Sequence, residues 1–236
     1  MGTEQKVAVI TGASQGIGAA LVKAYRDRNY RVVATARTIK PSNDDDVLAV
    51  PGDIADPKTA ERVISQGIAR FGRIDTLVND AGIFMSKPFT DYTEQDYASM
   101  VAVNLTGFFR LTQRVVPVML SQQKGHIVNI TTTLVDYASS DVPSVLVSMT
   151  KGGLASATRA LAIEYAGRGI RVNAVSPGVV ATQVGADESY EEEAGLHPLG
   201  RVGTVDDIVG GILFLESAPF VTGEILHIDG GQIAGH

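Results

Sequence analysis

The feature of this sequence that most constrains its fold is a regular alternation of two hydrophobic patterns. Short runs of β-branched and aliphatic residues, typical of buried strands, are separated by longer segments whose apolar residues recur with a helical period. A chain that runs strand, helix, strand in this way forms right-handed crossovers and a parallel sheet covered by helices on both faces. The predicted strands are residues 6–10, 31–35, 47–50, 76–79, 126–130, 170–175 and 224–228.

The helical segments carry start signals that fit this alternation. Residues 16–28 place apolar side chains on one face, and residues 93–120 begin with a capping box of Thr93 and Asp96. A similar start occurs at Thr204. The sequence has no internal repeat, low-complexity linker or break in composition, and an α/β domain of 236 residues is often undivided. The sequence therefore predicts one doubly wound α/β domain.

Composition excludes several classes of function. The formal net charge of −6 leaves no basic surface for nucleic acid, so no nucleic-acid partner is expected. The chain has no cysteine, which rules out disulfides, thiolate metal sites and a cysteine nucleophile, and no metal site is expected. No apolar run is long enough to span a bilayer, and the first ten residues are too polar for a signal peptide. We therefore expect a cytoplasmic protein without a membrane partner.

A glycine-rich stretch, TGASQGIG over residues 11–18, lies between the first predicted strand and the first predicted helix. In that context glycines allow a tight turn and let backbone N–H groups approach a pyrophosphate at the helix N-terminus. The spacing of Gly12, Gly16 and Gly18 differs from the common G-x-G-x-x-G pattern, and a simple glycine-rich turn is the alternative. The flanking strand and helix favour dinucleotide binding.

Further motifs follow this stretch in a recognisable order. They are NDAG (79–82), Asn104 in VNLTG, IVNITT (127–132), Lys151 in SMTKGGL, RVNAVSPG (171–178), PLGRVG (198–203) and IDGG (228–231). Together with TGASQGIG, these motifs resemble those of the short-chain dehydrogenase/reductase family over essentially the whole chain. The resemblance implies a single Rossmann domain over residues 1–236 with a seven-stranded parallel sheet. It also implies a small-molecule substrate, a homotetramer and a substrate lid at about residues 183–200.

The end of the second predicted strand bears on the choice of cofactor. A carboxylate there would bind the adenosine ribose and repel a 2′-phosphate, but this chain has Ala36 at that position. Arg37 follows, and a guanidinium suits a phosphate. We therefore expect NADP as the preferred cofactor, with NAD as the alternative if Arg37 is only a solvated loop charge.

The resemblance also assigns the other cofactor-binding residues. Asp53 and Ile54 resemble the pair that meets the adenine ring, and Thr182 resembles the residue that bonds the nicotinamide carboxamide. Asp80 stands where the family usually has a second asparagine, which trades a hydrogen-bond donor for a charge. The full set expected at the cofactor is Gly12, Ser14, Gln15, Gly16, Ile17, Gly18, Arg37, Asp53, Ile54, Asn79, Ala81, Gly82, Lys151, Pro177, Gly178, Val180 and Thr182.

In the family, a serine polarises the substrate carbonyl and a tyrosine four residues before a lysine exchanges the proton. The lysine holds the nicotinamide ribose and lowers the pKa of the tyrosine, and an asparagine anchors a water relay. Here Lys151 matches the lysine and Asn104 the asparagine. Thr132 matches the serine position, with Thr131 as the alternative because the segment that follows is longer than usual.

Val147 occupies the tyrosine position. Valine has no proton to exchange, and a positioned general acid is worth about 10²–10⁴ in rate. Three substitutes remain open: a water held by Asn104 and Lys151, the hydroxyl of Thr132, and Tyr137 in the lengthened loop. Tyr137 lies fourteen residues before Lys151 and so cannot share its helical face.

The segment Gln183–Leu196 takes the place of the substrate lid and is acidic. If it touches substrate, it disfavours anionic ones, including acyl groups on an acidic carrier protein. The sequence thus predicts an oxidoreductase that transfers hydride between NADP(H) and a small neutral carbonyl or alcohol, with an atypical proton donor. The alternatives are a dinucleotide-binding sensor without turnover and a subunit that assembles with an active relative. His126 and His227 are expected to be structural.

Overall fold

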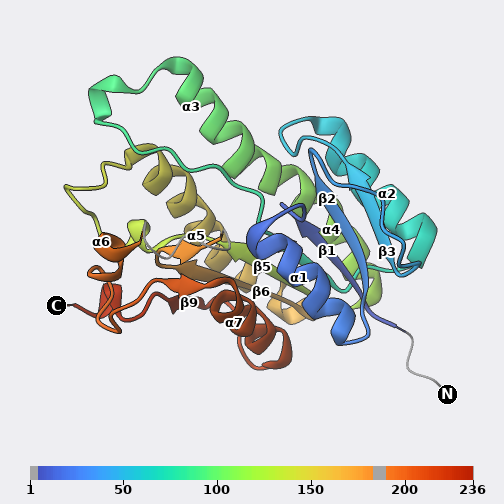
Figure 1. Ribbon diagram of the computed structural model, residues 1–236. Helices are drawn as coiled ribbons and strands as arrows, with labels where there is room; N and C mark the ends of the chain where they lie inside the picture. The colour runs from blue at the N-terminus through green and yellow to red at the C-terminus, as the bar shows by residue number, and fades with distance from the viewer. Residues whose placement is uncertain (1–4, 183–189, 236) are drawn as a thin grey trace.

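Seven parallel strands form one sheet in the order β3-β2-β1-β4-β5-β6-β9 (Figure 1). The computed structural model describes residues 5–182 and 190–235. The strands are β1 (Val7–Thr11), β2 (Arg31–Ala36), β3 (Val47–Pro51), β4 (Thr76–Asn79), β5 (Gly125–Ile130), β6 (Ile170–Pro177) and β9 (Ile225–Ile228). All seven predicted strands are confirmed, because buried parallel strands are near-continuous apolar runs and are visible in the sequence.

Helices cover both faces of this sheet, as predicted (Figure 1). On one face lie α1 (Gly16–Asp27) and α7 (Val205–Ser217). On the other lie α2 (Pro57–Phe71), α4 (Phe108–Gln122) and α5 (Val145–Tyr165). The minor elements include α3 (Glu94–Met100), α6 (Glu191–Ala194), a π-helix (Val101–Gly107), short 3-10 turns, and a two-stranded sheet of β7 (Val180–Ala181) and β8 (Gly203–Thr204).

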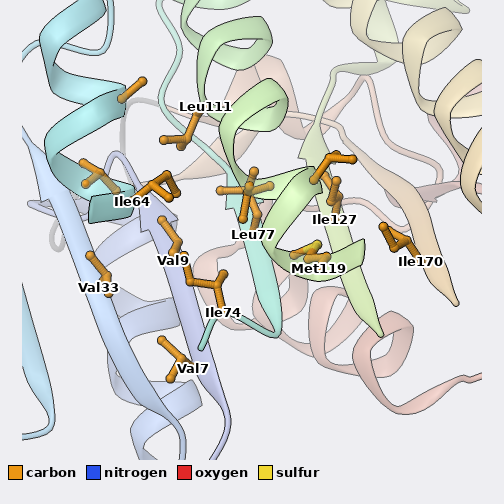
Figure 2. Packing of buried hydrophobic residues seen from close by; sticks show 14 of the residues in the cluster. Val7, Val9, Val33, Ile64, Ile74, Leu77, Leu111, Met119, Ile127 and Ile170 are labelled. Carbon is orange, nitrogen blue, oxygen red and sulfur yellow. The ribbon is translucent and has the colours of Figure 1, made fainter. Parts of the chain in front are cut away.

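The strand β1 shows how the sheet separates two cores. Val7 and Val9 point to the layer of α2 and α4, whereas Ala8 and Ile10 point to the layer of α1 and α7. Figure 2 shows the first core, in which Leu77 of β4 and Leu111 of α4 are fully buried. Burying a side chain of this size contributes about 1.5–3 kcal/mol each. The sheet is therefore a rigid support for the loops at its carboxyl edge.

Both predicted capping boxes are present. The Thr93 side chain accepts from the Asp96 N–H and the Asp96 side chain accepts from the Thr93 N–H at the start of α3. The same reciprocal pair joins Thr204 and Asp207 at the start of α7. The long helix expected over residues 93–120 is divided, however, because a π-helix separates α3 from α4. In the part of the chain that the structure describes, no helix is long and apolar enough to cross a membrane.

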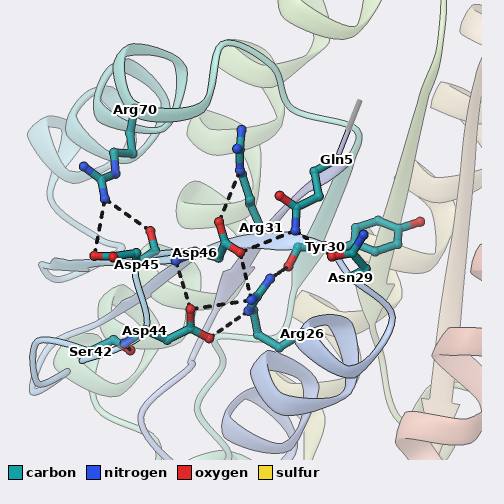
Figure 3. Close-up of polar contacts among 10 residues, drawn as sticks. All are labelled: Gln5, Arg26, Asn29, Tyr30, Arg31, Ser42, Asp44, Asp45, Asp46 and Arg70. Carbon is teal, nitrogen blue, oxygen red and sulfur yellow. Dashed lines mark hydrogen bonds and ion pairs between the residues drawn. The ribbon is translucent and has the colours of Figure 1, made fainter. Parts of the chain in front are cut away.

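An acidic run, Asp44–Asp46, precedes β3 and is held by arginines (Figure 3). Arg26 of α1 lies 2.9 Å from both Asp44 and Asp46. Two further ion pairs hold the run: Arg31 with Asp46 at 3.3 Å and Arg70 with Asp45 at 3.9 Å. Pairs at this exposure each contribute about 0–1 kcal/mol, so their main effect is on position. They fix the connection that leads from the end of β2 into β3.

A buried polar network lies at the amino edge of the sheet, away from the glycine-rich loop. The Glu216 carboxylate of α7 accepts from His126 Nδ1 at 2.8 Å, the Tyr30 hydroxyl at 2.8 Å and the Thr76 hydroxyl at 3.0 Å. Asn173 lies 3.2 Å from the other nitrogen of His126. Burial lowers the pKa of His126, against the Glu216 carboxylate, which raises it. His126 is therefore a structural histidine, as expected.

Candidate functional site

A cavity of about 650 Å³ opens at the carboxyl ends of β1 to β4. The strand order reverses between β1 and β4, and open parallel sheets bind ligands at such a switch point. Predicted cofactor residues that line this cavity are Gly12, Ser14, Gln15, Gly16, Ile17, Arg37, Asp53, Ile54, Ala81, Gly82 and Thr182. Thr35, Thr38 and Val103 also line it and were not expected from the sequence.

The glycine-rich loop forms one wall of the cavity. Gly12 and Gly16 have φ of +69° and +54°, a conformation that favours glycine. A Cβ on Gly18 would lie 2.5 Å from the Gly12 carbonyl oxygen, so the loop packs on the first turn of α1 without space for a side chain. Gln15 at the N-cap makes no side-chain capping bond, and the first turn of α1 has no acidic residue. This helix N-terminus is therefore suited to an external anion.

The NDAG segment is fixed to the end of β1. The Thr11 hydroxyl oxygen accepts from the backbone N–H groups of Asp80 at 2.9 Å and Ala81 at 2.8 Å. Asn79 is buried, and its amide donates to Asn129 Oδ1 at 2.9 Å. Asn79 was predicted to line the cofactor, but its side chain points toward β5 and the residue is not in the described lining of the cavity. It ends a buried strand, and its side chain is turned toward the neighbouring strand.

The end of β2 forms the outer part of the cavity. Ala36 and Arg37 both line it, and the Arg37 side chain is exposed. Within residues 5–182 and 190–235, the Arg37 guanidinium has no hydrogen bond or ion pair, and the acidic run Asp44–Asp46 is held by other arginines. Thr35 also lines the cavity, but its hydroxyl is buried and has no hydrogen-bond partner in the described chain. The exposed Arg37 guanidinium is therefore the group available to a polar ligand.

Lys151 of α5 lies at the inner end of this site. It is buried, and its Nζ donates to the Ile130 carbonyl oxygen at 2.6 Å. A Cβ on Gly82 would lie 2.9 Å from the same Nζ, so the ammonium sits directly behind a residue of the cavity wall. Burial lowers the pKa of Lys151 to about 8, against the opposing effect of the Asp80 carboxyl.

Asn104 lies in the π-helix that interrupts the long helical segment. Its Oδ1 accepts from the Ile83 N–H at 2.9 Å, and its Nδ2 donates to the Ile83 carbonyl at 3.0 Å and to the Thr150 hydroxyl at 3.1 Å. The Asn104 side chain therefore joins the π-helix to the segment after β4 and to α5. Single π-helical turns of this kind are frequent at functional sites.

The two candidate threonines after β5 differ in their surroundings. Thr131 is buried, and its hydroxyl donates to the Val175 carbonyl of β6 at 3.0 Å. Thr132 is partly exposed, and its hydroxyl accepts a long bond from the Leu134 N–H at 3.4 Å. The Thr132 hydroxyl is therefore the one free to meet a ligand.

Val147 lies on α5 four residues before Lys151 and is 2% exposed. Its surroundings are apolar: it forms a buried cluster with Met100 and Leu146. Partly buried residues packed on this cluster are Ile83, Met85, Tyr92 and Leu134. The Tyr92 hydroxyl donates to the Met85 carbonyl at 2.9 Å and so is already engaged. A buried apolar wall therefore stands one helical turn from the ammonium of Lys151.

Tyr137 is held by its backbone, which donates to the Thr133 carbonyl at 2.8 Å. Its side chain is half-buried and makes no hydrogen bond within the described residues. The structure thus does not bring its hydroxyl to Lys151, and Tyr137 is absent from the described lining of the cavity.

The remaining predicted residues lie at the end of β6 and beyond. Pro177 is buried, and the Gly178 N–H donates to the Ile228 carbonyl at 3.1 Å. A Cβ on Gly178 would lie 2.5 Å from His197 Cε1, so this turn has no space for a side chain. Val180 pairs with Gly203 in the small sheet. The predicted lid falls partly on residues 183–189, which lie outside the described residues.

Comparison with known proteins bears directly on this site. A family model described as enoyl-(acyl carrier protein) reductase matches residues 12–232. The 3-oxoacyl-[acyl-carrier-protein] reductase FabG of Thermotoga maritima is 34% identical over 249 residues, which cover 99% of this chain and 100% of the relative. The chain belongs to the short-chain dehydrogenase/reductase family. An uncharacterised oxidoreductase of Methylorubrum extorquens is 37% identical over 246 residues, covering 97% of this chain and 98% of the relative.

Solved structures of short-chain dehydrogenase/reductases share the whole architecture. ElxO with NADP bound superposes with a TM-score of 0.90 at 30% identity, covering 98% of this chain and 100% of that one. A variant of ElxO with NADPH bound gives a TM-score of 0.91 at 30% identity and the same coverage. The predicted fold, a Rossmann-like domain with a seven-stranded parallel sheet, is therefore confirmed.

Proposed function

We propose that this chain is an NADP-dependent oxidoreductase that transfers hydride between NADP(H) and a small neutral carbonyl or alcohol. The observation that carries the proposal is the cavity at the switch point, with an uncapped helix N-terminus and an unpaired Arg37 among the described residues. The family relatives named as reductases, and the neighbour ElxO named with NADP bound, support the same class of reaction.

The residues present fit a dinucleotide. The glycine-rich loop and the free N–H groups of α1 would hold the pyrophosphate, and Arg37 would hold the 2′-phosphate. Asp53 and Ile54 would meet the adenine, and Lys151 would bond the ribose diol. When bound, the nicotinamide would supply or accept the hydride. The chain's own task is then to orient the substrate and to provide a proton.

We infer that Val147 stands at the position where relatives carry the proton-exchanging tyrosine. The Thr132 hydroxyl would polarise the substrate carbonyl, since Thr131 is engaged with β6. The proton would come from a water between Lys151 and the segment fixed by Asn104, with Thr132 and Tyr137 as the other donors. A lysine whose pKa is lowered to about 8 exchanges its proton readily near neutral pH, which supports the water route.

A second candidate function is a dinucleotide-binding member of the family without turnover, acting as a sensor or subunit. The apolar cluster around Val147 favours it, because Tyr92, the tyrosine packed on this cluster, has its hydroxyl bonded to the Met85 carbonyl. In this case the cavity would bind NADPH while substrates would not be converted.

Two measurements on the purified protein separate these functions. Calorimetric titration with NADPH and NADH tests the cavity, and NADPH oxidation with a panel of ketones, aldehydes and 3-oxoacyl thioesters tests turnover. Binding with turnover of neutral carbonyls supports the oxidoreductase, and binding without any turnover supports the second candidate. Absence of binding to both cofactors would refute both.

Matched variants then test the proposed roles. Thr132→Val should lower turnover, since it removes the free hydroxyl at nearly constant volume. The Thr131 hydroxyl donates to a carbonyl of β6, so Thr131→Val should leave the turnover rate per NADPH-bound enzyme molecule unchanged. Equal effects of the two substitutions would contradict the assignment of Thr132.

Assembly, domain organisation and location are further parts of the proposal. We propose a homotetramer, a single domain over residues 1–236 with a lid at about residues 183–200, and a cytoplasmic protein. Light scattering on the purified chain tests the assembly, and a clean homotetramer would argue against a subunit that needs an active relative.

A further inference from the structure

Asp80 places a carboxyl group in the wall of the dinucleotide cavity. It lines the cavity beside the glycine-rich loop, and its backbone is fixed by the Thr11 hydroxyl. Its Oδ2 lies 2.8 Å from the Cβ position that either Gly12 or Gly18 would have, so the carboxyl packs directly on the loop. The Gly18 N–H, in the first turn of α1, acts on this carboxyl and lowers its pKa.

The Asp80 carboxyl lies beside the N-terminus of α1, where an external anion would bind. An ionised Asp80 places a negative charge beside the same helix N-terminus that would hold the pyrophosphate. Two anions that share one partly enclosed site disfavour each other's charge. A protonated aspartate, in contrast, has the shape of asparagine and offers one donor and one acceptor.

We propose that Asp80 couples dinucleotide binding to proton uptake: its carboxyl becomes protonated as the pyrophosphate enters beside Gly12 and Gly18. The proposal rests on the proposed function, because it assumes that the cavity takes a pyridine dinucleotide. It assigns Asp80 as the residue that makes affinity depend on pH.

The charges around Asp80 are consistent with titration in the neutral range. Burial raises the pKa of Asp80 to about 7, against the Lys151 ammonium and the Gly18 N–H, which both lower it. Lys151 on α5 is the charged side chain that acts on this carboxyl. The other charged side chains in the described lining are Arg37 after β2 and Asp53 after β3, while the loop itself has none.

The test is calorimetric titration of the whole protein with NADPH from pH 6.5 to 9, in pairs of buffers with different ionisation enthalpies. The difference between buffers gives the number of protons taken up. We expect uptake that approaches one above pH 7, and a Kd that rises by up to about tenfold per pH unit there. The 2′-phosphate of NADPH titrates near pH 6, so its contribution is small above pH 7, where the uptake by Asp80 is read.

Asp80→Asn should abolish the uptake, flatten the Kd above pH 7 and tighten binding at pH 9. Glu61→Gln is the control: it removes an exposed carboxyl of α2 that lies outside the cavity lining, and its proton uptake should equal that of the wild type. Thermal unfolding confirms that both variants are folded.

Three results would overturn the proposal while leaving the proposed function intact. These are NADPH binding by the wild type without proton uptake, equal uptake in Asp80→Asn, and loss of uptake in both variants. Uptake that persists in Asp80→Asn with a lower midpoint would identify Lys151 as the titrating group instead. Failure of the wild type to bind NADPH at any pH would refute the proposed function itself.

Discussion

Replacing Val147 with tyrosine tests the idea that a proton donor is missing from an otherwise intact site. Positions 147 and 151 are one turn apart on α5, a rise of about 6 Å, and side chains four residues apart share a face. A tyrosine at position 147 would therefore be a neighbour of the Lys151 ammonium. We expect carbonyl reduction to rise by about 10²–10⁴, the usual contribution of a positioned general acid.

The same substitution should destabilise the fold. Val147 is 2% exposed and packs against Met100 and Leu146, which are 0% and 4% exposed, so a larger ring overfills this cluster. Overpacking costs about 1–3 kcal/mol. For a chain of this length, that cost corresponds to a fall in Tm of roughly 2–12 °C.

The assay is steady-state NADPH oxidation with the carbonyl panel, together with thermal unfolding and NADPH titration of each variant. Val147→Phe is the matched control, because it adds nearly the same bulk without the hydroxyl. Phenylalanine should reproduce the loss of stability but give no gain in rate. A folded Val147→Tyr that binds NADPH and reduces substrate no faster than Val147→Phe would refute the reasoning.

Two further substitutions test other parts of the structure. Arg37→Ala should weaken NADPH binding roughly tenfold in calorimetric titration, because one charge-assisted contact is lost, and should leave NADH binding unchanged. Glu216→Gln should lower the free energy of unfolding at pH 7 by about 1–3 kcal/mol in urea titrations, since His126 and Tyr30 lose a charged acceptor. Burial alone would raise the pKa of Glu216, but these hydrogen bonds lower it from 4.5 to about 2. Its contribution is therefore complete above pH 4.5 and is lost as the pH falls toward 2, so the difference between variant and wild type should shrink over that range.

The main sheet was predictable because its central strands are buried on both faces, while the edge strands β3 and β9, though less buried, are still aliphatic runs. Every one of the seven runs of β-branched and aliphatic residues is a strand. The small sheet of β7 and β8 was not predicted, since two-residue strands such as Val180–Ala181 have no periodicity to detect. The π-helix Val101–Gly107 was missed for a related reason: it changes the register of backbone hydrogen bonds without changing the apolar period.

The site was predictable in its residues more than in their orientation. The glycine-rich loop and Arg37 line the cavity as expected, because motif and strand end fix their place. Asn79 and Asp80 are adjacent, yet one amide faces Asn129 inside the sheet and the other side chain faces the cavity. Successive residues at a strand end point to opposite sides, and the motif alone does not say which residue serves the ligand.

The hydrogen bond from Lys151 to the last carbonyl of β5 has a consequence for how a ligand is received. A free lysine side chain carries about 2 kcal/mol of rotamer entropy, which association would have to remove. In this chain the loss already occurred on folding, since the Ile130 carbonyl immobilises the ammonium before any ligand arrives. The Lys151 ammonium is therefore preorganised for binding. Substitutions that loosen the end of β5 should weaken the affinity for the ligand even though they remove no direct contact with it.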